Sequence, residues 1–166
     1  MTIPIISVVG KANAGKTTLL EKVIAELTGR GYRVATIKHN IHGFEIDQEG
    51  KDSWRLKKAG ARMTVISSPQ RLALIEDLDK DISLAAIRDK YIHDVDLILS
   101  EGYKGNPFPQ IEVLRAGLNA DFLSPRGNEL LAFASDIKID GDIPCFNIND
   151  AAGIVDLIEK KILKTA

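Results

Sequence analysis

The chain has 166 residues, 45% of them hydrophobic and 27% charged, with a formal net charge of −1 at pH 7. A chain of this length and composition can bury one core, so we expect a single domain over residues 1–166. The balanced charge gives no reason to expect a nucleic acid or a membrane as partner. Cys145 is the only cysteine and no apolar run reaches the about 18 residues of a membrane span, so we expect a cytoplasmic protein without disulfides.

The first element predicted along the chain is a strand over residues 3–9, a continuous apolar run of the kind buried on both faces of a parallel sheet. A helix over residues 17–31 and a second strand over residues 32–37 complete a βαβ unit. Between the first strand and the helix, residues 10–17 have the pattern G-x-x-x-x-G-K-T of a phosphate-binding loop, or P-loop. The pattern and its flanking elements together predict a site for nucleotide phosphates.

Each residue type in this loop has an expected role. Gly10 and Gly15 permit the tight turn that directs backbone N–H groups at phosphate oxygens, and the following helix adds the partial positive charge of its N-terminus. Lys16 should reach the terminal phosphates, which makes it a candidate catalytic residue, and the Thr17 hydroxyl should ligate Mg²⁺. Lys11 is either a second cation for the phosphates or a solvated loop lysine. The residues expected to contact the nucleotide are Gly10, Lys11, Ala12, Asn13, Ala14, Gly15, Lys16, Thr17 and Thr18.

A polar segment over residues 40–50 precedes a short helix over residues 52–61 and should form a switch-like loop. Asp47 in this loop is expected either to contact the magnesium ion or to cap the helix. A transition-metal site is disfavoured, because His39 and His42 have neither a nearby cysteine nor a firm ligand spacing.

Strands over residues 63–67 and 71–75 are joined by a short Ser-Pro-Gln segment, which favours a hairpin and hence a mixed sheet. The remaining elements are a helix over residues 81–91, strands over 95–100, 110–114, 130–134 and 144–148, and a last helix capped by Asn149 or Asp150. This order predicts an α/β fold of the P-loop NTPase type: a mixed, mostly parallel sheet flanked by helices, with an inserted β-hairpin. Ligands should bind at the carboxyl ends of its strands.

Two carboxylates are candidate ligands of the metal, one within the strand over residues 95–100 and one directly after it. Asp96 and Glu101 are separated by about 16 Å of extended chain, so they lie at opposite ends of the strand. Only Glu101 is at the carboxyl end, and it is assigned to Mg²⁺ or its water shell and to catalysis, with a strand-end cap as the alternative. Asp96 is assigned a structural role.

Asp136 follows the strand over residues 130–134 and is the candidate for reading the base. A carboxylate there could accept hydrogen bonds from both N1–H and N2–H₂ of guanine, a donor pair that adenine lacks. The chain has no Asn-Lys-x-Asp sequence, the usual reader of guanine. The preference for GTP over ATP therefore depends on Asp136, and a turn cap is the competing interpretation.

Beyond the phosphate-binding loop, several segments resemble the molybdopterin-guanine dinucleotide biosynthesis protein B family, MobB, and the resemblance covers nearly the whole chain. These segments are residues 38–39, Asp47, and residues 50–53, 58–61, 97–104 and 134–136. The resemblance implies a homodimer that binds GTP with Mg²⁺ and hydrolyses it slowly. It also implies an accessory role beside the guanylyltransferase that attaches GMP to the molybdenum cofactor, with molybdopterin as a further candidate partner.

The resemblance supports Glu101 near the metal and Asp136 near guanine. At the phosphates it supports Gly10, Gly15, Lys16 and Thr17. Lys11 departs from the small or aromatic residue typical of the family at that position. One alternative is an ATP-dependent small-molecule kinase, although the sequence has no compact arginine-bearing lid. Another is a metal-insertion GTPase, although the sequence has no cysteine- or histidine-rich tract. A third is an adaptor that binds nucleotide without hydrolysing it.

Overall fold

The computed structural model describes residues 2–103, 105–118, 123 and 129–163, and the chain folds into two compact units. Residues 1–39 and 84–166 form one of them, called the sheet unit below, and residues 40–83 form the other, called the insert unit. The expectation of one domain over residues 1–166 stays a prediction, since compactness alone does not decide whether the two units fold together.

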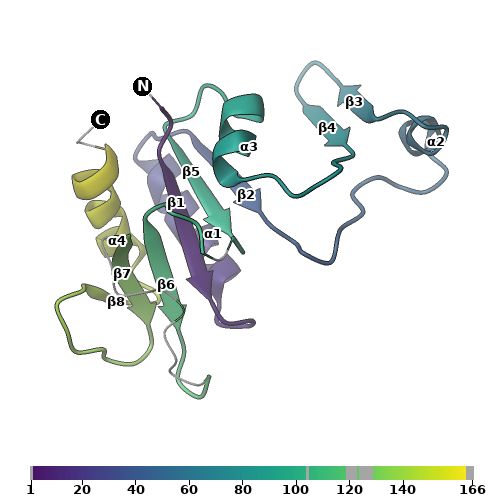
Figure 1. Cartoon of the computed structure of the whole chain (residues 1–166). Helices are drawn as coiled ribbons and strands as arrows, with labels where there is room; N and C mark the ends of the chain where they lie inside the picture. The colour runs from purple at the N-terminus through teal and green to yellow at the C-terminus, as the bar shows by residue number, and fades with distance from the viewer. Residues whose placement is uncertain (1, 104, 119–122, 124–128, 164–166) are drawn as a thin grey trace. The chain divides into compact units, whose positions relative to one another are not determined.

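The sheet unit is built on a parallel sheet whose described strands have the order β2-β5-β1-β6-β7-β8 (Figure 1). Every pairing between these strands is parallel. All carboxyl ends therefore lie at one edge of the sheet, which is where ligands of such folds bind. The strands are β1 (Ile5–Gly10), β2 (Val34–Lys38), β5 (Leu97–Glu101), β6 (Gln110–Leu114), β7 (Leu130–Ser135) and β8 (Cys145–Asn147).

The helices of the sheet unit are α1 (Lys16–Gly29), α3 (Leu84–Tyr91), α4 (Ala151–Ile158) and a π-helical segment η1 (Glu159–Leu163). Asp150 is the N-cap of α4, and its carboxylate accepts a hydrogen bond from the Gly153 N–H at 2.9 Å, in agreement with one of the two predicted caps. None of the helices in the described part of the chain combines the length and the hydropathy that crossing a bilayer requires.

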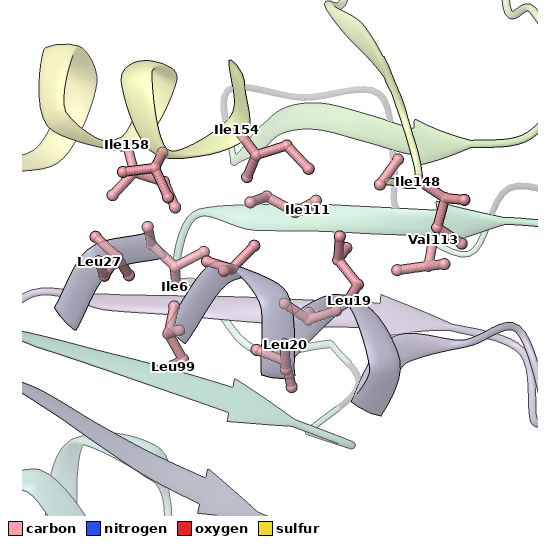
Figure 2. Close-up of a cluster of buried hydrophobic side chains, with 14 of the residues drawn as sticks. Ile6, Leu19, Leu20, Leu27, Leu99, Ile111, Val113, Ile148, Ile154 and Ile158 are labelled. Carbon is pink, nitrogen blue, oxygen red and sulfur yellow. The ribbon is translucent and has the colours of Figure 1, made fainter. Parts of the chain in front are cut away.

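Helices α1 and α4 cover one face of the parallel sheet (Figure 2). Apolar residues of α1 recur at helical spacing, so one side of the helix turns toward the sheet. Its buried residues are Leu19, Leu20, Val23 and Leu27. A second cluster brings Leu84 of α3 against Ile5 and Ile98 on the sheet's other face. The sheet is thus buried on both sides, which explains the continuous apolar runs in its central strands.

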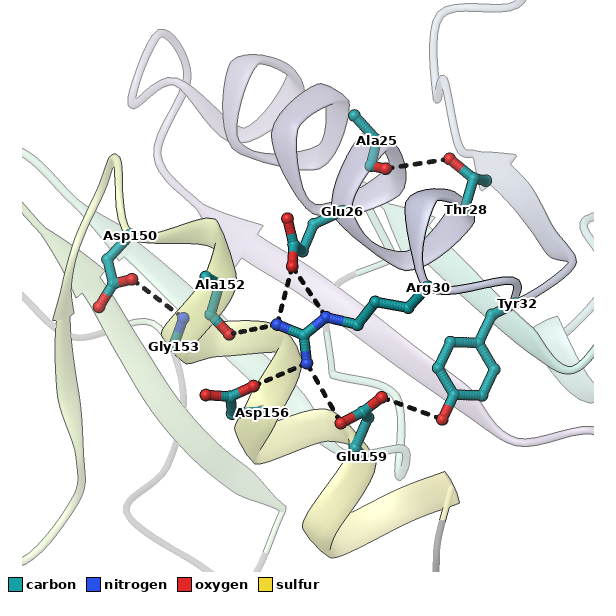
Figure 3. Close-up of polar contacts among 10 residues, drawn as sticks. All are labelled: Ala25, Glu26, Thr28, Arg30, Tyr32, Asp150, Ala152, Gly153, Asp156 and Glu159. Atoms are coloured by element: carbon teal, nitrogen blue, oxygen red, sulfur yellow. Dashed lines mark hydrogen bonds and ion pairs between the residues drawn. The ribbon is translucent and has the colours of Figure 1, made fainter.

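Arg30, at the C-terminus of α1, ties that helix to α4 and η1 (Figure 3). Its guanidinium contacts Glu26 at 2.8 Å, Asp156 at 2.7 Å and Glu159 at 3.2 Å. Hydrogen bonds to Asp156 and then to Glu26 raise the pKa of Arg30 further above its ordinary value. The Tyr32 hydroxyl donates to Glu159 at 3.1 Å, which raises the pKa of Tyr32. These contacts fix α1, whose opposite end forms the candidate site, against the last helix.

The insert unit contains α2 (Asp52–Lys58) and an antiparallel hairpin of β3 (Met63–Ser67) and β4 (Leu72–Glu76). The predicted α/β fold with an inserted hairpin is confirmed. The hairpin was expected to join the main sheet, but among the described residues β3 and β4 pair only with each other and form a sheet of their own. A short connection, residues 68–71, closes their antiparallel ladder locally, so the hairpin forms without a partner strand from the parallel sheet.

Candidate functional site

The segment over residues 10–17 joins β1 to α1 at the carboxyl edge of the parallel sheet, where the sequence places it. Gly10 has a φ of +150°, and a Cβ there would lie 2.7 Å from the carbonyl oxygen of Val113 on β6. Asn13 and Gly15 have φ angles of +61° and +93°. Left-handed backbone at these positions turns the chain sharply between strand and helix, and the Val113 carbonyl leaves room only for glycine at position 10.

The start of α1 is suited to an anion. Gly15 is its N-cap and has no side chain that could accept a hydrogen bond from the first turn. The first N–H groups of a helix lack intrahelical partners and carry the positive end of its dipole. The Nζ of Lys16 donates to the carbonyl oxygens of Gly10 at 3.1 Å and Lys11 at 2.7 Å, so its ammonium lies over the loop. Uncapped N–H groups and a cation at one turn fit a phosphate group.

Glu101 ends β5, directly beside β1 in the sheet. Its Oε2 accepts a hydrogen bond from the Thr17 hydroxyl at 3.0 Å and lies 3.8 Å from the Nζ of Lys38. Two of the three predicted metal ligands are therefore together at the edge of the loop, in a carboxylate–hydroxyl pair. Mg²⁺ prefers hard oxygen ligands and usually takes one or two carboxylates together with phosphate oxygens. The residues present fit a magnesium ion that is shared with a bound phosphate.

Lys38 is a site residue whose contact with Glu101 the sequence analysis did not predict. The last residue of β2, it pairs in register with Glu101 and so brings its ammonium to the same carboxylate. The sequence indicates that Lys38 and Glu101 each lie at the end of a strand. It does not indicate the order of the strands in the sheet, and only that order shows that β2 and β5 are neighbours.

Asp136, the candidate base reader, lies just beyond the carboxyl end of β7. Its Oδ1 accepts a hydrogen bond from the Ala116 N–H at 2.8 Å, and its Oδ2 lies 3.5 Å from a guanidinium nitrogen of Arg115. The carboxylate therefore holds the segment that follows β6, as the alternative interpretation of a turn cap anticipated. About a third of the side chain is exposed, 34%, so a role in reading guanine stays a prediction.

A cavity of about 540 Å³ lies beside Asp136, within the connection from β7 to β8, and residues 135–147 line it. Its volume is in the range of small-molecule sites. Ile148 directly follows the lining residues, and its Cδ1 lies 3.6 Å from the position that a Cβ on Gly15 would take. Ile148, which follows β8, is therefore close to the loop, while the cavity itself is lined by the β7–β8 connection and the strand residues that flank it. Sequence analysis missed it except for Asp136, because a polar connection between two strands gives no sign of its shape.

Asp47, the third predicted metal ligand, lies in the insert unit. Its Oδ1 accepts hydrogen bonds from the Ser53 hydroxyl at 3.0 Å and from the Gln48 N–H at 2.8 Å. Its Oδ2 is buried and lacks a hydrogen-bond partner among the described residues. Asp47 therefore holds the loop onto the first turn of α2, close to the alternative of a helix cap, although Lys51 is the N-cap residue. Its contact with magnesium stays a prediction.

Asp96 lies at the opposite edge of the sheet, as its place in the strand predicts. Its carboxylate pairs with Arg33 at 2.8 Å and accepts a hydrogen bond from the Arg33 N–H at 2.7 Å. The side-chain hydrogen bonds from Arg33, with the backbone bond next, lower the pKa of Asp96 to about 2. Asp96 therefore connects the start of β2 to the start of β5 and has no part in the site.

A family model described as MobB, molybdopterin guanine dinucleotide synthesis protein B, matches residues 5–136. A molybdopterin-guanine dinucleotide biosynthesis adapter protein of Haemophilus influenzae is 37% identical over 159 residues, covering 95% of this chain and 88% of the relative. The adapter protein of the same description from Escherichia coli is 35% identical over 162 residues, covering 94% and 91%.

Solved structures give the same result for the fold. A crystal structure of molybdopterin-guanine biosynthesis protein B aligns with a TM-score of 0.77 and 30% identity over 94% of this chain and 98% of that one. Bacillus subtilis MobB aligns with a TM-score of 0.75 and 27% identity over 95% and 97%. These similarities confirm the predicted P-loop NTPase-like fold class.

Proposed function

Since the chain belongs to the molybdopterin guanine dinucleotide synthesis protein B family, MobB, and so has a role in molybdopterin guanine dinucleotide biosynthesis, we propose that it acts there as a GTP-binding adapter. In this proposal the β1–α1 loop binds the phosphates of GTP together with Mg²⁺, and the bound GTP is hydrolysed slowly. The adapter assists the guanylyltransferase that attaches GMP to molybdopterin, and that enzyme and molybdopterin are its proposed partners.

The observation that carries the nucleotide proposal is the convergence of Lys16, Thr17 and Glu101 at one edge of the sheet. Thr17 belongs to α1 and Glu101 to β5, and the Thr17 hydroxyl lies 3.0 Å from the Glu101 carboxylate. The ammonium of Lys16 lies over the loop and donates to the carbonyl oxygens of Gly10 and Lys11. In P-loop NTPases a lysine cradles the β- and γ-phosphates while a loop hydroxyl and a strand-end carboxylate hold Mg²⁺. Here Glu101 supplies the carboxylate.

Slow hydrolysis follows from what these side chains can do. Lys16 neutralises charge on the phosphate oxygens, and Thr17 and Glu101 orient the metal, which when bound adds positive charge beside those oxygens. A water oxygen forms a bond to the γ-phosphorus while the bond to the β–γ bridging oxygen breaks; the electron pair leaves with GDP, and a proton of the water passes to a phosphate oxygen or to solvent. In this proposal the side chains supply charge neutralisation and hold the metal, and turnover is slow.

The strand order supports a place for the base. β5, which carries Glu101, lies on one side of β1, and β6, β7 and β8 lie on the other. With the metal and the terminal phosphates on the β5 side, the ribose and base extend toward β8. The cavity over residues 135–147 lies in the connection from β7 to β8, on that side of β1. We propose that it receives guanine, with Asp136 at its edge as the reader of the N1–H and N2–H₂ donors.

The proposed homodimer is supported by the surface of the insert unit. A two-stranded hairpin is at best marginally stable in water by itself, so burial of its exposed apolar side chains would stabilise it. Large apolar side chains are exposed on one face of β3 and β4, because alternate residues of a strand share a face and Val65 pairs with Leu74, and exposed apolar surface of this kind is typical of an interface. They are Met63, Val65, Leu72 and Leu74. A second copy of the same hairpin fits, because a two-fold interface buries the same patch on both chains.

Calorimetric titration with GTP and with ATP, each with and without Mg²⁺, tests the nucleotide proposal, and release of phosphate then measures turnover. Selective GTP binding with slow release is expected. Selective ATP binding would contradict the role of Asp136 and favour a kinase, which would also need a phosphate acceptor. Tight GTP binding without any hydrolysis would leave only a binding adaptor.

The single cysteine permits a separate test of the base site. Cys145 is half-buried and lines the cavity. Reaction of its thiol with a disulfide reagent should slow when GTP is bound, while pyrophosphate, which has no base, should leave the rate unchanged. Equal protection by both ligands would place the base elsewhere.

Light scattering after size exclusion tests the homodimer. Val65→Glu adds a charge to the exposed hairpin surface and is expected to give a monomer. Gln70→Glu, at the exposed hairpin turn, adds the same charge outside the apolar patch and is the matched control. A wild-type monomer, or an unaffected Val65→Glu dimer, would contradict the assignment.

A further inference from the structure

Ser7 and Ser100 form a buried hydrogen bond on the sheet face opposite α1. They are partners in the register of β1 and β5, and their Oγ atoms are 2.8 Å apart. Only 1% of Ser7 and 0% of Ser100 is exposed. Ser100 directly precedes Glu101, and β1 continues from Ser7 to Gly10. Ser7 and Ser100 therefore belong to the two strands that lead into the candidate site, β1 to the loop and β5 to Glu101.

Asn106, in the connection from β5 to β6, extends this hydrogen bond into a directed chain. The Ser7 hydroxyl donates to the Oδ1 of Asn106 at 3.1 Å. A hydroxyl carries one proton, so Ser7 must accept in its bond with Ser100. The donors therefore run from Ser100 through Ser7 to Asn106.

The side-chain amide of Asn106 has one possible orientation. Its Nδ2 donates to the Tyr103 carbonyl oxygen at 2.6 Å, and its Oδ1 also accepts from the Phe108 N–H at 3.0 Å. A carbonyl cannot donate and an N–H cannot accept, so exchanging the amide oxygen and nitrogen would break both bonds. Asn106 thus holds Tyr103 and Phe108 together and fastens them to Ser7 of β1.

The start of the same connection is held near Glu101 by the end of β2. The Tyr103 ring stacks on the His39 ring with centroids 4.2 Å apart and planes at 21°. The His39 N–H donates to the Glu101 carbonyl oxygen at 2.8 Å. Gly102 has a φ of +97°, and a Cβ there would lie 2.7 Å from the His39 carbonyl oxygen. Glycine at position 102 therefore lets these two segments cross closely.

We propose that Asn106 is a positioning residue for Glu101. By fastening the connection after β5 to Ser7, it holds the Glu101 carboxylate toward Thr17 and so sets the affinity of the site for Mg²⁺. The inference rests on the proposed function, because it needs a nucleotide and a metal at the β1–α1 loop. Asn106 acts through the backbone of its connection and through Ser7, so binding of GTP without Mg²⁺ should not depend on it.

Titration of Mg²⁺ into the protein with GTP, alongside GTP titrations in EDTA, tests the proposal. Asn106→Ala removes three hydrogen bonds, and we expect the Mg²⁺ concentration at half-saturation to rise about three- to tenfold, with GTP affinity in EDTA within about twofold of wild type. The matched control is Asn149→Ala, which removes a bond from Lys22 of α1 at 2.6 Å and should leave both quantities unchanged.

Ser100→Ala removes only the first donor of the chain and should shift the midpoint less, in the same direction. It also carries the test if Asn106→Ala does not fold. Equal losses of GTP affinity with and without Mg²⁺ would indicate a merely structural role and overturn the proposal. A wild-type protein without Mg²⁺-dependent nucleotide binding would overturn the proposed function and this inference together. Normal wild-type binding with unshifted midpoints in the variants would overturn this inference alone.

Discussion

The β1–α1 loop makes a prediction that a pair of glycine substitutions can test. Gly10 faces Val113 in the register of β1 and β6, and a Cβ on residue 10 would lie 2.7 Å from the Val113 carbonyl oxygen. That oxygen belongs to the backbone of a buried strand, so it cannot move aside cheaply. The φ of +150° adds conformational strain for any residue with a Cβ. Gly10→Ala should therefore cost about 1–3 kcal/mol of folding stability.

Gly29→Ala adds the same methyl group at the end of α1, where nothing lies within 4 Å of the new Cβ. Because alanine favours the helix over glycine, we expect this control to gain about 0.5–1 kcal/mol. Urea unfolding followed by circular dichroism measures both variants, and a gap of about 1.5–4 kcal/mol between them is expected from these terms. Equal stability of the two variants would refute the assignment of Gly10 to a close approach between loop and β6.

Three further outcomes are expected. Lys16→Ala should weaken GTP binding at least about tenfold by calorimetry, and unchanged affinity would remove the loop from the phosphate site. Glu101→Gln should slow phosphate release more than it weakens binding, because it removes the charge that orients the metal. Stability should fall as the pH drops from about 4 toward 2, because the folded pKa of Asp96 is about 2 against an ordinary 3.8; in Asp96→Asn this component of the acid unfolding curve should be absent.

The sequence was sufficient for those parts of the fold that depend on local pattern. Glycine spacing and the apolar runs on both sides predict the strand, loop and helix over residues 3–31, and the structure places β1 and α1 there. The position of Glu101 at a strand end was predicted from strand geometry alone. Its distance from Thr17 then follows, because parallel strands bring their carboxyl ends to one edge.

Features that depend on which segments pair were not predictable in this way. The hairpin of β3 and β4 was expected in the main sheet, since alternation and turn residues reveal a hairpin but not the sheet it joins. The hydrogen bond from the Ala116 N–H to Asp136 joins two strand ends, and a sequence pattern does not state that β6 and β7 are neighbours. The same holds for Lys38 beside Glu101.

Strand order also determines where the proposed metal-binding groups and the proposed base site lie relative to β1. With β1 between β5 and β6, the groups suited to a metal and the cavity suited to a base lie on opposite sides of one loop. The proposed nucleotide would match this division, with its phosphates at the loop beside Glu101 and its base at the cavity. Neither side alone identifies such a ligand: a lysine, a hydroxyl and a carboxylate would serve many phosphate compounds, and the cavity would accept many rings. We propose a nucleotide because its two ends match the two sides, which β1 and its loop separate.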